Sequence, residues 1–214
     1  MTERDSLVLN IELTLISIIQ GVALYFLVES SRVPIVERHY AAWPYIAGGL
    51  VIILLFWSRS IIHGLTVIRW PLEFGHNFLY VALTLVECVA FTQVGNPKNW
   101  FALNSVYAAL IWLLFVWDLR LIRRRAGEDR SPAGQQLYAV VQKDQLRNIR
   151  FLMPAALGFT LGATLLIHYF PGFFLERGGH WYPALFQLAA ALAYLAHSLR
   201  FYERLKPLQD KVIA

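Results

Sequence analysis

Charged residues and cysteine are both scarce in this chain. Only 15% of its 214 residues are Asp, Glu, Lys or Arg, against roughly 25% in a typical soluble domain. Cys88 is the only cysteine, which excludes an intramolecular disulfide and a metal site built on a cysteine pair. The mean hydropathy of +0.50 and the long apolar runs indicate instead a protein that crosses a membrane several times.

The motifs of the common enzyme classes are missing as well. The sequence contains no HExxH, GxSxG, Walker or GxGxxG pattern, so we predict no catalytic residue and no metal. His63 and His197 form the one histidine pair in the inner half that a haem would require, and we predict no cofactor. The net charge of +5 does not indicate nucleic-acid binding, because the basic residues cluster beside apolar segments.

Six apolar stretches are long enough to cross a hydrocarbon core, which takes about 20 helical residues. They cover residues 7–28, 44–68, 74–95, 99–121, 150–170 and 183–204. These stretches lack strand alternation, and lipid does not tolerate unpaired backbone groups outside helices and closed barrels. We therefore predict an all-α fold, with residues 1–214 forming a single membrane domain of six transmembrane helices.

Lysine and arginine predict the orientation of the helices. In the six-span arrangement, fourteen of the 19 basic residues lie on the side of the N-terminus, four lie on the opposite side, and Arg59 lies within a span. Because positive loops stay in the cytoplasm, we expect both termini there, in a multi-pass protein of the cell (inner or plasma) membrane.

The segment 122–149 is the one sizeable stretch outside the predicted spans. It opens with basic residues, and Ser131-Pro132 has the pattern of a helix N-cap followed by a first-turn proline. Leu137, Val140 and Val141 then recur at helical spacing. We predict a cytoplasmic amphipathic connector that contacts anionic lipid headgroups. A surface for docking a partner protein is the alternative.

Polar residues line one face of each of the second and third spans. The first set is Arg59, His63 and Thr66, and the second is Tyr80, Thr84 and Glu87. If the connecting turn is centred near Glu73, Arg59 and Glu87 lie at the same depth. We predict that they form an ion pair, since an unpaired charge in a bilayer costs about 2.5–3.5 kcal/mol. Pairing of Arg59 with Glu12, or snorkelling, remains open.

Other spans carry further polar and small residues. The secondary polar candidates are Glu12, Gln20, Asn104, Tyr107 and His197, and the sixth span also carries Gln187 and Tyr194. We expect His197 to be a packed core residue and Asp118 to be an interfacial charge. Gly158 and Gly162 form a small-xxx-small face for helix packing, either within the chain or between copies.

An intramembrane cluster of ionisable side chains is a candidate functional site. The sequence therefore favours an oligomeric channel or transporter for ions or small solutes. We expect a homo-oligomer, because six helices leave little room for a pathway within a single chain. The alternatives are a non-catalytic accessory protein that docks a partner protein, and a membrane enzyme or sensor. No nucleic acid is expected as a partner.

Overall fold

The computed structural model describes residues 3–62 and 74–213, and within these ranges the chain is helical and forms no strand. The long helices are α1 (Glu3–Val36), α2 (Trp43–Ile62), α3 (Phe74–Phe91), α4 (Pro97–Glu128), α5 (Pro132–Arg147), α6 (Met153–Tyr169) and α7 (Trp181–Ile213). The described residues also contain three short helical turns, which are the 3-10 helix η1 (Tyr40–Ala42) before α2, the π-helix η3 (Asn148–Leu152) between α5 and α6, and the π-helix η4 (Gly172–Glu176) between α6 and α7. The predicted all-α class is confirmed.

Among the described residues, five helical stretches are long and apolar enough to cross a membrane. They are Thr14–Val36, Tyr40–Ser60, Pro97–Glu128, Pro132–Tyr169 and Trp181–Lys211. The predicted span 74–95 corresponds to a shorter apolar helix, Gly75–Phe91, whose 17 residues rise about 26 Å. The protein is thus a multi-pass helical membrane protein, and the stretch that corresponds to α3 is shorter than the five named above.

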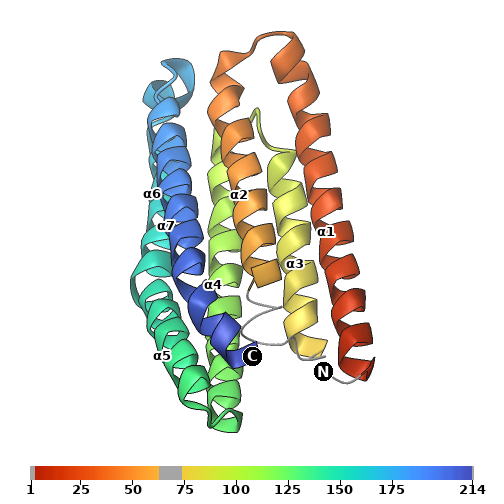
Figure 1. The fold of residues 1–214 in the computed structure, drawn as a ribbon. Helices are drawn as coiled ribbons and strands as arrows, with labels where there is room; N and C mark the ends of the chain where they lie inside the picture. Colours follow the sequence, from red (N-terminus) through yellow and green to blue (C-terminus); the bar gives the residue numbers. More distant parts are fainter. Residues whose placement is uncertain (1–2, 63–73, 214) are drawn as a thin grey trace.

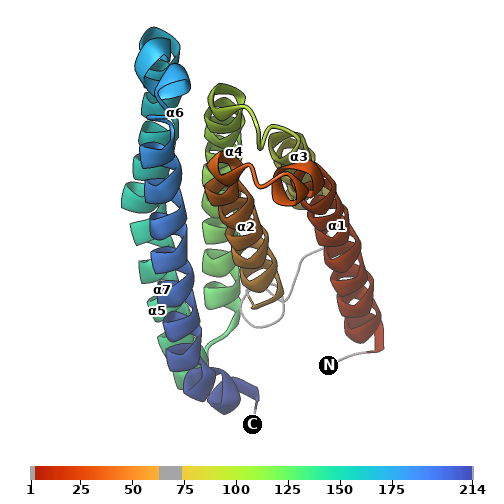
Figure 2. The same cartoon turned by 90° about the horizontal axis from the view of Figure 1, so that it is seen from above.

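The helices form three layers (Figures 1 and 2). Helices α2 and α4 lie in the middle, with α1 and α3 on one side and α6 and α7 on the other. Close packing follows the same order, since α1 packs against α2 and α3, α4 against α3 and α6, and α2 against α7. Both termini lie at one end of the bundle, together with the α4–α5 junction (Figure 1). We call this the basic end, after Arg120, Arg123, Arg124, Arg125 and Arg130, and the opposite end the loop end.

The segment 122–149, predicted to be a connector, is mostly helical and belongs to α4 and α5. Its basic stretch continues α4 as far as Glu128, and α5 then begins at the predicted cap, where Ser131 Oγ accepts a hydrogen bond of 3.0 Å from the Gly134 amide. The apolar face of α5, with Leu137 and Val141, is buried against α4 and α7. That face therefore meets protein rather than headgroups, and contact of the basic residues with anionic lipid stays a prediction.

The small-residue face of α6 has no partner helix among the described residues. A methyl group added at Gly158 or Gly162 would meet no atom within 4 Å. The predicted close packing of this face within the chain is therefore wrong, because α6 packs on α4 through its other side, which includes the buried Ala163 and Ile167. A seam between two copies stays a prediction.

Candidate functional site

A cavity of about 370 Å³ lies between the middle layer and the α6–α7 layer. Most of its wall is apolar, with side chains such as Ile52 from α2, Ile111 from α4 and Phe159 from α6. The cavity has the size of a small-molecule site. Polar residues line it at two levels: Asn104 and Asp118 are 14 residues apart on α4, which corresponds to about 21 Å of helix.

At the loop end, three side chains form a hydrogen-bonded group beside the cavity. Trp100 Nε1 donates to Gln187 Oε1 at 2.8 Å, Gln187 Nε2 donates to Asn104 Oδ1 at 3.2 Å, and Asn104 Nδ2 donates to the Trp100 carbonyl at 2.9 Å. The group joins α4 to α7, and its polar atoms satisfy one another. Asn104, a predicted candidate, therefore has a packing role at this end.

A tyrosine and a histidine connect the same end to the α6–α7 loop. Tyr45 packs edge-on against Trp100 with ring centroids 5.4 Å apart, and its hydroxyl lies 2.9 Å from His180 Nδ1. Burial lowers the pKa of His180, because removal from water disfavours the charged imidazolium. The neutral histidine thus holds the loop over Tyr45.

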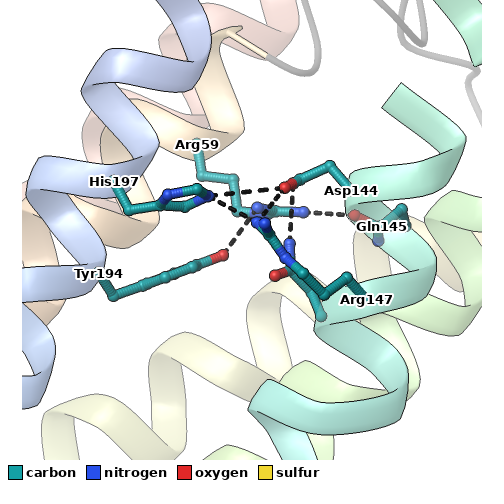
Figure 3. A network of polar contacts seen from close by, with 7 residues as sticks. Arg59, Asp144, Gln145, Arg147, Tyr194 and His197 are labelled. Carbon is teal, nitrogen blue, oxygen red and sulfur yellow. Dashed lines mark hydrogen bonds and ion pairs between the residues drawn. The ribbon is translucent and has the colours of Figure 1, made fainter. Parts of the chain in front are cut away.

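At the basic end of the cavity, Arg59 joins three helices (Figure 3). Its Nη1 donates a hydrogen bond of 3.0 Å to the Tyr194 hydroxyl of α7, and its Nη2 donates to Gln145 Oε1 of α5. The guanidinium carbon also lies 4.0 Å from the centre of the Phe115 ring of α4, a cation–π contact worth about 0.5–2 kcal/mol. Gln145 in turn donates from Nε2 to the Phe115 carbonyl at 2.8 Å.

No carboxylate of the described residues forms an ion pair with Arg59. Asp118 lines the same end of the cavity but is hydrogen-bonded to His76 Nε2 at 2.9 Å. Asp144 is bonded to Arg147 and Asn148. The bonded partners of Arg59 are thus neutral, and its buried Nε has no hydrogen-bond partner. Within the part of the chain that the structure describes, a positive charge at the edge of an apolar cavity is therefore left without a bonded counter-ion.

A second polar group lies beside Arg59, nearer to solvent. Arg147 Nη2 lies 2.6 Å from His197 Nε2 and also contacts Asp144, which is 3.7 Å from the same histidine nitrogen (Figure 3). The His197 side chain is 45% exposed. The prediction of a packed core residue is therefore wrong for His197, because its position on α7 points toward the polar side chains of Asp144 and Arg147 at the surface.

The predicted ion pair between Arg59 and Glu87 is not formed. The Phe56 and Tyr80 rings lie 5.2 Å apart, so these two residues share a level, and by symmetry Arg59 is level with Asn77. Glu87 is ten residues farther along α3, or about 15 Å toward the loop end. The prediction failed because it centred the α2–α3 connection near Glu73, five positions beyond the midpoint of the observed pairing.

The other predicted site residues fall in several places. His63 and Thr66, and the side chain of Glu12, lie outside the described residues. Tyr80 packs against His76 with ring centroids 5.0 Å apart, and Thr84 donates to the Tyr80 carbonyl at 3.1 Å. Asp118 is 3% exposed, so the predicted interfacial charge is a buried one, bonded to His76 across the α3–α4 contact.

Glu87, Gln20 and Tyr107 come together from three helices on the other side of the middle layer. Gln20 of α1 lies beside the Glu87 carboxyl of α3, and Tyr107 of α4 is close enough to interact electrostatically with the same carboxyl. All three side chains are buried. Among the described residues, no partner meets hydrogen-bond geometry for either Glu87 oxygen, either polar atom of the Gln20 amide or the Tyr107 hydroxyl.

Sequence reasoning did not identify Gln145 and Asp144 as site residues. Leu137, Val141 and Gln145 are spaced four apart, so Gln145 continues the apolar stripe of α5. The position of Gln145 on this apolar face could have identified it, because a buried polar side chain needs a hydrogen-bond partner on the helix that it packs against. Asp144, next to that stripe and half-buried, carried no such signal.

Comparison with protein-family models, with curated proteins and with solved structures found no match for this chain.

Proposed function

We propose that this protein is a transporter for a small molecule with an apolar body and an anionic head, which binds in the cavity beside Arg59. The observation that supports the proposal most directly is the guanidinium itself. It lines an apolar cavity while its bonded partners, Tyr194 and Gln145, are neutral.

The physical chemistry of the cavity favours such a ligand. A buried arginine is stabilised by an anion that offers two oxygens to its planar fork, and its Nε is still available for a bond. The apolar wall along α4 and α6 would solvate the body of the ligand. The combination suits a carboxylated or phosphorylated amphiphile, which also partitions into the bilayer that surrounds the protein.

An ion pathway through a single chain has less support. Ions need polar groups along the whole path, whereas the wall of this cavity is polar mainly at Asn104 and Gln187 and around Arg59. A channel formed between several copies, an accessory role, and an enzyme or sensor remain predictions from the sequence alone.

The test is a comparison of two probes that differ in head charge. Dodecanoate and its methyl ester have the same apolar chain, and only the first is an anion. With protein in nanodiscs of neutral lipid, we expect dodecanoate to bind about tenfold to a hundredfold more tightly than the ester, since a hydrogen bond to a charged group contributes about 1.5–3 kcal/mol. Arg59→Gln should remove this preference, and Arg59→Lys should keep part of it.

Arg177→Gln is the matched control, because Arg177 is exposed at the loop end and does not line the cavity. It should leave the preference unchanged. Equal binding of acid and ester to the unmodified protein would contradict the proposal. If dodecanoate binds tightly but does not enter proteoliposomes, the protein binds such a molecule without transporting it, and the transport part of the proposal is wrong.

A further inference from the structure

The Gln20–Glu87–Tyr107 group forms no hydrogen bond with the Arg59 network among the described residues, and it is an unusual place for a carboxyl. Glu87 is 2% exposed, Gln20 4% and Tyr107 6%. None of their side-chain polar atoms has a partner at hydrogen-bond geometry among the described residues. Buried polar groups in folded proteins nearly always have partners, so three such groups at one point indicate a small species that completes their bonding.

The charged groups around Glu87 indicate what kind of small species could complete the hydrogen bonding of this group. The titratable group near it on α4 is Tyr107, the polar group near it on α1 is the uncharged Gln20, and Cys88 is its neighbour on α3. No lysine, arginine or histidine of the described residues forms an ion pair with it. An ionised carboxylate without a counter-charge is costly inside a membrane.

A proton satisfies this group completely. In a neutral carboxylic acid, the Glu87 hydroxyl donates to Gln20 Oε1 and the Glu87 carbonyl accepts from Gln20 Nε2, which gives a two-bond acid–amide pair. The second lone pair of that carbonyl accepts from the Tyr107 hydroxyl. Each of the five unpartnered atoms then has a bond, with the donors and acceptors that these side chains provide.

We infer that Glu87 is an intramembrane proton-binding site that exchanges its proton with the cavity through Tyr107. Tyr107 is the link because it is close enough to Glu87 to interact with it electrostatically and also lines the cavity. Its hydroxyl can pass on a proton by accepting one and donating another. The site does not depend on the cavity carrying an amphiphile, so it stands or falls separately from the proposed function.

Infrared spectroscopy of the protein in nanodiscs tests the inference directly. At neutral pH the unmodified protein should show the C=O stretch of a protonated carboxylic acid. Glu87→Gln should lack this band, and Glu176→Gln, which changes an exposed carboxyl, should keep it. The band should vanish as the pH is raised, and replacing Na⁺ by choline should not change it.

Two further variants keep the test decisive if Glu87→Gln does not fold. Gln20→Leu removes the amide partner and should move the band to higher frequency, and Tyr107→Phe should slow the shift that D₂O produces. A missing acid band at neutral pH, together with thermal stability that depends on Na⁺, would show an ionised carboxylate with a bound metal cation and overturn the inference. A band that never shifts in D₂O would overturn the exchange with the cavity.

Discussion

Arg59 illustrates how a single charge can be held in a membrane without an ion pair. Tyr194, Gln145 and the Phe115 ring surround its guanidinium and come from three different helices. An arginine cannot lose its charge in response to burial, so its neutral partners must stay in place. Removal of any one of them leaves a charged donor unsatisfied, which is more damaging than the loss of a neutral hydrogen bond.

His180 provides the pH-dependent contact at the residue scale. Burial lowers its pKa in the folded protein, so the unfolded chain binds a proton first as the pH falls below about 6.5. Stability should therefore be complete above that value and decline below it. We expect the melting temperature in nanodiscs to drop between about pH 7.5 and about pH 5.5, and to drop less in His180→Gln.

His39→Gln is the control for this prediction, because the side chain of His39 is 56% exposed. Its melting temperature should follow the unmodified protein at both pH values. If His180→Gln loses as much stability as the unmodified protein on acidification, the contact with Tyr45 does not carry the pH dependence.

At the scale of the element, α5 acts as part of a three-helix core at the basic end. Leu137 is 1% exposed and packs with Ile122 of α4 and Leu205 of α7. Leu137→Ala should lower the free energy of unfolding by about 2–5 kcal/mol, as for other buried leucines. Val140→Ala on the same helix should have a much smaller effect, since Val140 is 42% exposed. Denaturation of the purified protein would measure both, and equal losses would mean that α5 faces lipid.

This helix shows what the sequence could and could not predict. Ser131, Pro132 and the spacing of Leu137 and Val141 predicted the start and the apolar face of α5 correctly, because both depend on local chemistry. The sequence could not say whether headgroups or other helices would cover that face, since amphipathicity is the same in both cases. The hydrogen bond between Gln145 and Arg59 depends on this packing, so the sequence could not predict it either.

Depth along the bundle was the other quantity that sequence reasoning misjudged. The polar stripe of Tyr80, Thr84 and Glu87 lies on one helix as predicted. The assumed centre of the α2–α3 turn was wrong by five residues, however, and in antiparallel helices such an error shifts the residue that lies opposite a given position by ten. Ten helical residues correspond to a difference in depth of about 15 Å, which separates Glu87 from Arg59 and places them in two sites. Side-chain packing such as Phe56 on Tyr80 fixes this register, and composition does not reveal it.

For the whole molecule, the layout makes a topological prediction. With Cys88 replaced by alanine, Gly95→Cys at the loop end and Gln136→Cys on α5 each place an exposed thiol. A membrane-impermeant maleimide should label them from opposite sides, with residue 136 on the cytoplasmic side by the distribution of basic residues. Labelling of both from one side would contradict the six-crossing arrangement, in which α3 spans despite its length.

The π-helical turn η3 fixes the rotational phase between α5 and α6. The stretch Pro132–Tyr169 is continuous, and each residue of a regular helix turns it by about 100°, so one residue more or less within η3 would rotate α5 against α6 by that angle. A π-turn is the usual form in which a helix accommodates such an extra residue. Deleting one residue there should turn Gln145 away from Arg59, so chain length at η3, and not side-chain identity alone, decides whether α5 is bonded to α2.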